Sequence, residues 1–176
     1  IEDTSNVLTL ATSYTDTAGN AGPTVSTANF TIDTKEPTVT SFTMADAALK
    51  VGEDSVVTLV FSEAVAVFSS AADITVVNGV LDPMTSSDNI TWTGTFTPTD
   101  DIEDTTNILQ LATSYTDSAG NSGPTAQTAN YSIDTKEPIL SNGSSIGTTT
   151  DTTPTFTFTS SEAGIITSSL GFSTSN

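Results

Sequence analysis

The sequence predicts an all-β fold made of antiparallel β-sandwich modules in tandem. Two observations lead to this prediction. One is a long internal repeat, and the other is a series of short runs in which apolar and polar residues alternate with a period of two. No run shows the 3.6-residue period of an amphipathic helix. Each run therefore indicates a strand with one face toward a core and the other toward water.

The repeat joins two segments far apart in the chain. Residues 1–37 and 102–138 align without gaps, and 28 of 37 positions are identical at an offset of 101 residues. Such similarity indicates a tandem duplication. The complete module is then 38–138, whereas 1–37 is the C-terminal part of a preceding module. Residues 139–176 are the N-terminal part of a following, divergent module, which shares Ser-Glu-Ala (residues 62–64 and 161–163) with the complete one.

About seven short strands are expected in the complete module, separated by turn-forming clusters such as LDPMTSSDN. This number of strands in about 100 residues fits an immunoglobulin-like sandwich. The expected strands lie near 38–44, 55–61, 64–68, 73–78, 90–97, 107–115 and 127–133. The expected core consists of Val57, Leu59, Phe61, Trp92, Phe96 and Leu109 or Leu111.

The two flanking segments hold too few strands to form a core of their own, since an isolated pair of strands is at best marginally stable in water. We expect them to be parts of longer modules or to be completed by neighbouring chains. The chain also begins in the middle of the repeat pattern, with no signal peptide visible, which suggests a fragment of a longer protein.

The composition excludes several classes of site. The chain lacks Cys and His, which excludes disulfides, zinc and haem ligation by these residues, and acid–base catalysis by histidine. Its formal charge is −18, with three lysines and no arginine, so it repels nucleic acid and anionic membranes. It attracts hard cations, which prefer oxygen ligands. No apolar run is long enough to span a membrane.

Three motifs carry a resemblance to a known family. They are TDSAGNSG at 116–123 (TDTAGNAG at 15–22), IDTKEP at 133–138 (repeated at 32–37) and LVFSEAV at 59–65. Together they resemble the bacterial Ig-like tandem repeats of giant surface adhesins, including those with a terminal RTX secretion region. The resemblance implies a secreted protein at the bacterial cell surface, a stalk that carries a distal adhesive domain in cell adhesion or biofilm, and calcium at the module junctions. The RTX nonapeptide itself is absent.

Acidic residues gather where two modules should meet. If successive loops alternate between the two ends of the sandwich, the loops at Glu63 and Asp117 share one end, and those at 53–54 and 100–104 share the other. Each junction then combines acids from the loops of both modules and from the linker between them, and calcium accepts such irregular oxygen sets. The candidate calcium ligands are Asp33, Glu36, Glu63 and Asp117 at the first junction, and Asp101, Glu103, Asp104, Asp134, Glu137 and Glu162 at the second. The alternative is that these acids are solvated turn residues.

The favoured function is a structural stalk whose partners are adjacent modules of the same chain. An enzyme with paired carboxylates is disfavoured, because the acid pairs recur in repeated turns without an aromatic sugar platform. A pilin crosslinked by an isopeptide bond is disfavoured because two of the three lysines, Lys35 and Lys136, lie in linkers. A subunit of an extracellular filament or sheath, packed laterally against neighbouring chains, remains the alternative. No nucleic acid, membrane insertion or receptor is indicated.

Overall fold

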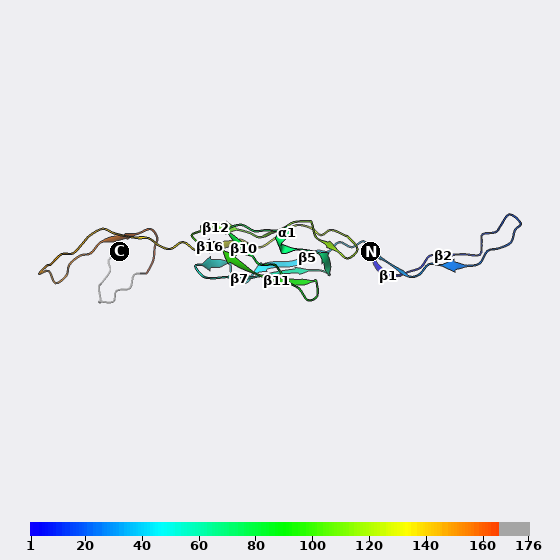
Figure 1. The fold of residues 1–176 in the computed structure, drawn as a ribbon, viewed down its shortest axis with the longest axis horizontal. Helices are drawn as coiled ribbons and strands as arrows, with labels where there is room; N and C mark the ends of the chain where they lie inside the picture. Colours follow the sequence, from blue (N-terminus) through cyan, green and yellow to red (C-terminus); the bar gives the residue numbers. More distant parts are fainter. Residues whose placement is uncertain (166–176) are drawn as a thin grey trace.

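The computed structural model describes residues 1–165 and consists of a central β-sandwich with a thin two-stranded arm at each end (Figure 1). The N-terminal arm comprises residues 1–37 and the C-terminal arm begins at Ile139. The two arms extend from opposite ends of the sandwich, so the molecule is elongated (Figure 1). Over the described residues the architecture is all-β apart from one four-residue helix, as the alternating pattern predicts.

One layer of the sandwich is a four-stranded antiparallel sheet in the order β10–β11–β7–β5. In β7, Ser55, Val57, Leu59 and Phe61 are buried, and the residues between them are exposed or partly buried. This is the outcome expected of period-two alternation, because successive side chains of a strand point to opposite faces. The strands are β5 (Val39–Met44), β7 (Ser55–Phe61), β10 (Gly79–Leu81) and β11 (Thr91–Pro98).

The second layer is built from short paired segments that together cover the first sheet. Within it β16 pairs in parallel with β6, and all the other pairs are antiparallel. The parallel pair arises because the chain crosses from β5 of the first layer into β6 of the second. The segments are β6 (Ala48–Lys50), β8 (Val65–Val67), helix α1 (Ser70–Asp73), β9 (Ile74–Thr75), β12 (Glu103–Asn107), β13 (Gln110–Leu111), β14 (Thr116–Asp117), β15 (Ala126–Gln127) and β16 (Tyr131–Asp134).

A chain of aromatic rings links the two layers. Phe61 of the first layer lies 4.9 Å from Tyr115 of the second, measured between ring centroids, and Phe96 lies 5.4 Å from Tyr131. Trp92 packs edge-on against Phe68 at 4.8 Å. The predicted core is confirmed for Val57, Leu59, Phe61, Phe96, Leu109 and Leu111, which are all buried. Trp92, in contrast, is only partly buried at the margin of the core.

The strand expected at 73–78 differs from the structure. Residues 70–73 form helix α1, and only β9 follows it, paired with β13 of the second layer. Asp73 explains the helix: its carboxylate accepts the backbone N–H of Ser69 at 2.8 Å and also a hydrogen bond from the Ser114 hydroxyl. Three strands were not expected from the sequence. β6 and β10 are each only three residues long, too short for alternation to reveal. β12 begins in the segment expected to be a loop at 100–104, and of the strand expected at 107–115 only Asn107, which ends β12, and β13 lie in strands.

Each arm is a pair of antiparallel segments without a covering layer. In the N-terminal arm, β1 (Glu2–Asn6) pairs with β4 (Phe30–Asp33), and β2 (Thr9–Leu10) pairs with β3 (Val25–Ser26). In the C-terminal arm, β17 (Leu140–Asn142) pairs with β18 (Phe158–Ser160). Residues 166–176, which the sequence assigns to the following module, lie outside the described residues.

The aromatic contact between the layers gives a first prediction. Phe61→Ala should lower the free energy of unfolding by about 3–5 kcal/mol, because it leaves a cavity beside Tyr115 and Phe68. Urea unfolding followed by the fluorescence of Trp92, the single tryptophan, measures this change. Val56→Ala is the matched control, since this exposed neighbour on β7 should change stability by less than about 0.5 kcal/mol. Equal effects of the two substitutions would contradict the assigned core.

Candidate metal site

Asp117 organises the loop between β14 and β15. Its Oδ1 accepts the backbone N–H groups of Ala119, Gly120 and Asn121 at 2.8–2.9 Å, and its Oδ2 accepts Asn121 Nδ2 at 2.8 Å. Gly120 has a φ of +95°, which glycine adopts without the strain other residues incur. The Asp-x-Ala-Gly-Asn sequence thus folds into a closed loop around its own carboxylate, which is buried.

The same loop forms in the N-terminal arm, where no second layer covers it. Asp16 Oδ1 accepts the N–H groups of Ala18 and Asn20, and Asp16 Oδ2 accepts Asn20 Nδ2 at 2.8 Å. Gly19 takes the equivalent positive φ of +90°. The hydrogen bond from Asn20 is the largest cause that holds the pKa of Asp16 below its usual value. The loop geometry therefore follows from the motif itself and does not require the rest of the module.

Asp117 meets two acids from other elements at the junction between the N-terminal arm and the sandwich. Asp33 ends β4 of the arm, and Glu63 follows β7 in the loop before β8. One carboxylate oxygen from each of the three residues lies within 4.8 Å of those of the other two. Asp117 is buried and the other two are partly buried. The cluster thus joins one acid of the arm with two from loops of the sandwich, whereas Glu36 and the loop acids of the preceding module take no part in it.

The negative charge of this cluster is partly balanced by a lysine in the linker. Lys35 Nζ lies 3.4 Å from Glu63 Oε1 and 3.6 Å from Glu2 Oε2. The charge of Glu63, and secondarily that of Glu2, raises the pKa of Lys35. Asn121 Nδ2 also donates to the Asp33 carbonyl at 3.2 Å, which ties the Asp117 loop to the linker. The four carboxylates of Glu2, Asp33, Glu63 and Asp117 meet one ammonium, so the junction keeps excess negative charge.

The donor set fits a hard cation. Glu63 Oε1 is buried and takes no hydrogen bond, although Lys35 lies within ion-pair distance. Oδ1 of Asp117 is occupied by three N–H donors, whereas Oδ2 takes only one, so Oδ2 is the oxygen free to bind a cation. Burial works to raise the pKa of Asp117, but hydrogen bonds from Asn121, Ala119 and Gly120 outweigh it and lower the pKa, so the carboxylate stays ionised. Calcium accepts such loop carboxylates.

The other candidate ligands do not join this cluster. Glu36 and Glu137 are exposed in the two linkers, and Asp134 is exposed at the end of β16, where it pairs in register with Glu103. Asp101 has a φ of +61° in the turn before β12. Within residues 1–165, Asp33, Glu63 and Asp117 form the one group of three possible metal ligands.

Asp104 and Glu162 also lie at the second junction, in different surroundings. The carboxylate of Asp104 accepts the Thr106 N–H at 2.8 Å and Asn78 Nδ2 at 2.9 Å, and the bonds from Thr106 lower its pKa. These bonds give Asp104 a structural role within the module. Glu162 resembles Glu63: it is partly buried, and its Oε1 takes no hydrogen bond.

Two residues that contact the cluster, Lys35 and Asn121, are not among the residues predicted from the sequence. The sequence places Lys35 in the linker, and nothing in its neighbourhood indicates that it reaches Glu63 across the junction. Asn121 could have been found, since the spacing of Asp117 and Asn121 recurs in Asp16 and Asn20. Asp88, outside the cluster, accepts the N–H groups of Ile90 and Thr91 at the start of β11.

Comparison with known proteins gives one family. The family model described as a bacterial Ig-like domain matches residues 33–133, more than half of the chain. No curated protein and no solved structure matches the chain. Among the described residues there is no helix long and apolar enough to cross a membrane.

The Asp117 loop gives a second prediction. Asp117→Asn should lower the free energy of unfolding at neutral pH by about 1.5–3 kcal/mol, because the hydrogen bonds it accepts lose their ionised acceptor. Asp16→Asn is the matched control: it changes the same loop outside the sandwich and should cost less than about 0.5 kcal/mol. Urea unfolding followed by Trp92 fluorescence measures both.

The difference in unfolding free energy between the wild type and Asp117→Asn should depend on pH. The pKa of Asp117 is lower in the folded state than in the unfolded state, where it is about 3.9. The ionised carboxylate therefore stabilises the fold fully at pH values above about 3.9, and this stabilisation is lost as the pH falls through the folded pKa. The stability gap between wild type and Asp117→Asn should therefore close in acid. A gap that is constant from neutral pH to acid would show that the carboxylate charge has no part in it.

Proposed function

The chain belongs to the family of bacterial Ig-like domains, and on that premise we propose that it is a structural repeat region of a bacterial extracellular adhesin, rigidified by calcium at its module junctions. The family is a structural rather than a catalytic fold and is typical of surface or extracellular proteins. The observation that carries the proposal is the Asp33–Glu63–Asp117 cluster, since it lies between the N-terminal arm and the sandwich and draws on both.

The tandem arrangement is supported by hydrogen bonds that recur at equivalent positions. Thr38 N–H donates to Ser62 Oγ at 2.9 Å and Ser62 N–H donates to the Thr38 carbonyl at 2.8 Å. At the next linker, Ile139 and Ser161 make the same two bonds at 2.8 and 3.0 Å. The divergent segment after 139 thus begins as the complete module does. We therefore treat 1–37, 38–138 and 139–176 as parts of three successive modules.

Calcium would replace the repulsion between the acidic ends of adjacent modules by an attraction. Like charges about 4–6 Å apart repel by roughly 1 kcal/mol per exposed pair in a water-like dielectric. One calcium ion between Asp33, Glu63 and Asp117 would accept oxygens from the linker and from both loops, and would favour the aligned arrangement by mass action. Millimolar extracellular calcium fills sites with a dissociation constant of about 10⁻⁴ M. The stalk would then be rigid outside the cell and more pliable in the calcium-poor cytoplasm.

The laterally packed filament or sheath stays an alternative prediction. It requires contacts along the sides of the sandwich rather than at its ends. Electron microscopy of the native assembly distinguishes the two, because single thin threads indicate a stalk and ordered lateral arrays indicate a filament.

Calcium binding by the purified chain gives the third prediction. Titration calorimetry should detect one site, and millimolar calcium should raise the free energy of unfolding by about 1.5 kcal/mol for a dissociation constant near 10⁻⁴ M. Glu63→Gln should abolish both effects, because it removes the charge of a buried oxygen that lacks a hydrogen bond. The matched control is Glu162→Gln, which alters the equivalent Ser-Glu-Ala segment away from Asp33 and Asp117 and should leave both effects intact.

Two outcomes would contradict this proposal. One is that calcium gives the wild-type chain neither a heat of binding nor a higher free energy of unfolding. The other is an equal loss in Glu63→Gln and Glu162→Gln, which would place the ion elsewhere than at the three-carboxylate cluster.

A further inference from the structure

The sandwich contains two Asn-x-Ser/Thr sequons, the sequence that N-glycosylation enzymes modify. Asn89 opens one of them (NIT), and Asn130 opens the other (NYS). Such sequons arise by chance in a chain rich in threonine, so the sequence alone does not separate a modified asparagine from an unmodified one. The structure separates them, because an enzyme has to reach both the asparagine amide and the hydroxyl two residues later.

Asn89 lies in an exposed turn directly before β11. Its φ is +59°, a conformation that asparagine adopts more readily than most residues. Asp88 holds this turn, because its Oδ1 accepts the N–H groups of Ile90 and Thr91 at 2.9 and 2.8 Å. The backbone of the sequon is thus fixed by a neighbouring carboxylate, and the Asn89 amide has no part in fixing it.

Both reactive groups of this sequon are open to solvent. The side chains of Asn89 and Thr91 are exposed. Among the described residues, Asn89 is bonded only through its backbone carbonyl, which accepts the Val65 N–H at 3.0 Å. Thr91 is likewise bonded through its backbone, and its side chain points away from the core because the next residue, Trp92, points toward it. A transferase therefore meets an amide and a hydroxyl that no protein group has to release.

The sequon of Asn130 is held by the fold. Asn130 Nδ2 donates to the Thr105 carbonyl at 2.9 Å, and the Ser132 hydroxyl donates to the Ala47 carbonyl at 3.5 Å. The sequon continues into β16, the middle strand of the β12–β16–β6 sheet, so strands flank it on both sides. Its central residue, Tyr131, is only 1% exposed. An enzyme can engage this sequon only after the strand has left the sheet.

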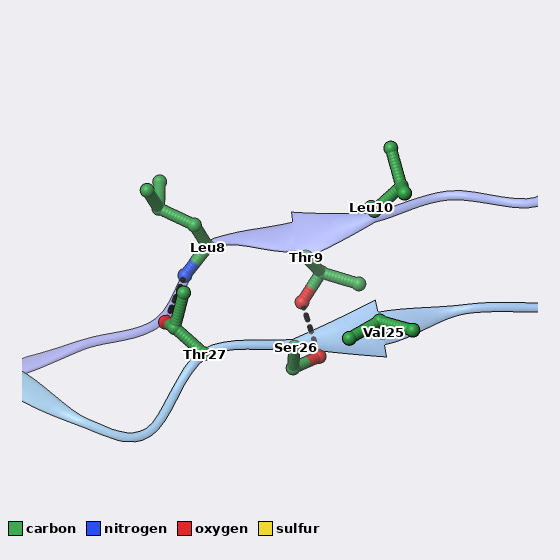
Figure 2. A pocket seen from close by; sticks show the side chains of 6 residues that line it. All are labelled: Leu8, Thr9, Leu10, Val25, Ser26 and Thr27. Carbon is green, nitrogen blue, oxygen red and sulfur yellow. Dashed lines mark hydrogen bonds between the residues drawn. The ribbon is translucent and has the colours of Figure 1, made fainter.

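The repeat contains a copy of this sequon, which is bonded in the same way. Asn29 Nδ2 donates to the Thr4 carbonyl at 2.8 Å. Just before it, the hydroxyls of Ser26 and Thr27 also bond to the opposite strand (Figure 2). The bonded asparagine is therefore a feature of the repeated hairpin. The side chain of Asn142, which opens a fourth sequon, lies outside the part of the chain that the structure describes.

We propose that Asn89 is the residue at which the folded sandwich accepts an N-linked sugar. The donor is a hexose joined through its anomeric carbon to a nucleoside diphosphate, and a separate transferase brings it to the turn. Asn89 Nδ2 attacks the anomeric carbon and loses one proton. A bond forms between this nitrogen and the anomeric carbon, the bond from that carbon to the diphosphate oxygen breaks, and the nucleoside diphosphate leaves.

The proposed sugar stands at the end of the sandwich that carries the calcium candidates. Phe61 and Val65, on either side of the Glu63 loop, donate their N–H groups to the carbonyls of Ile90 and Asn89 at 3.0 Å each. A hexose on Asn89 adds bulk and hydroxyl groups beside this loop but no charge. Asn89 supplies none of the three carboxylates of the cluster, so the sugar site and the calcium site stand or fall separately.

Incubation of the purified chain with a bacterial asparagine N-glucosyltransferase and UDP-glucose, followed by mass spectrometry, tests the proposal. Asn29→Gln and Asn142→Gln are present in every sample, so that only the two sequons of the sandwich are counted. This parent chain should gain one hexose, since one of its two sequons is accessible. Asn89→Gln should abolish the gain, and Asn130→Gln should leave it unchanged.

A second pair of variants leaves both asparagines in place. Thr91→Ala destroys the sequon and should also abolish the gain of hexose. Thr93→Ala is the matched control, because it removes an exposed threonine from the same face of β11 and should leave the gain unchanged. The proposal is overturned if the parent chain gains no hexose, if the hexose is found on Asn130, or if Thr91→Ala and Thr93→Ala behave alike.

Discussion

The burial of one apolar hairpin face determines the organisation of this molecule. Where the β5–β7–β11 sheet covers that face, Leu109, Leu111 and Tyr115 are completely buried and a sandwich forms. Where no sheet covers it, the nearly identical residues 1–37 keep the same strand pairing and hydrogen bonds but leave their side chains in water. Local sequence thus sets the shape of the hairpin, and a covering sheet supplies the hydrophobic free energy that stabilises it.

The ends of the module bring together acidic residues from separate elements. Because the strands run along the length of the sandwich, their loops meet the neighbouring segment end to end, and the linker is too short to hold them far apart. The carboxylates of Asp33, Glu63 and Asp117 are therefore brought together by three elements that are distant in sequence. Lys35 offsets only part of their charge. If calcium binds as proposed, the junction responds to cations, while the core of the module is held by apolar contacts that do not.

Much of the fold was predictable because strand alternation and the repeat are local signals. The residues of β7 and β11 that should face the core do so, with Trp92 at its margin. Helix α1 and the three-residue strands β6 and β10 were not predictable, since they depend on the side-chain bonds of Asp73 and on partners across the sandwich. At the site, the grouping of Glu63 with Asp117 followed from loop alternation. The contact of Lys35 with Glu63 joins two separate segments of the chain, so no pattern in the sequence around Lys35 indicates it.

The central claim is that calcium stiffens the junction between successive modules. Small-angle X-ray scattering of the dilute monomer, in millimolar calcium and in excess chelator, tests it most directly, because the maximum dimension reports the angle between the N-terminal arm and the sandwich. We predict a longer particle with a narrower distance distribution in calcium, and no such difference in Asp33→Asn. Scattering curves of the wild type that coincide in calcium and chelator would contradict the account and would identify the three carboxylates as ordinary solvated turn residues.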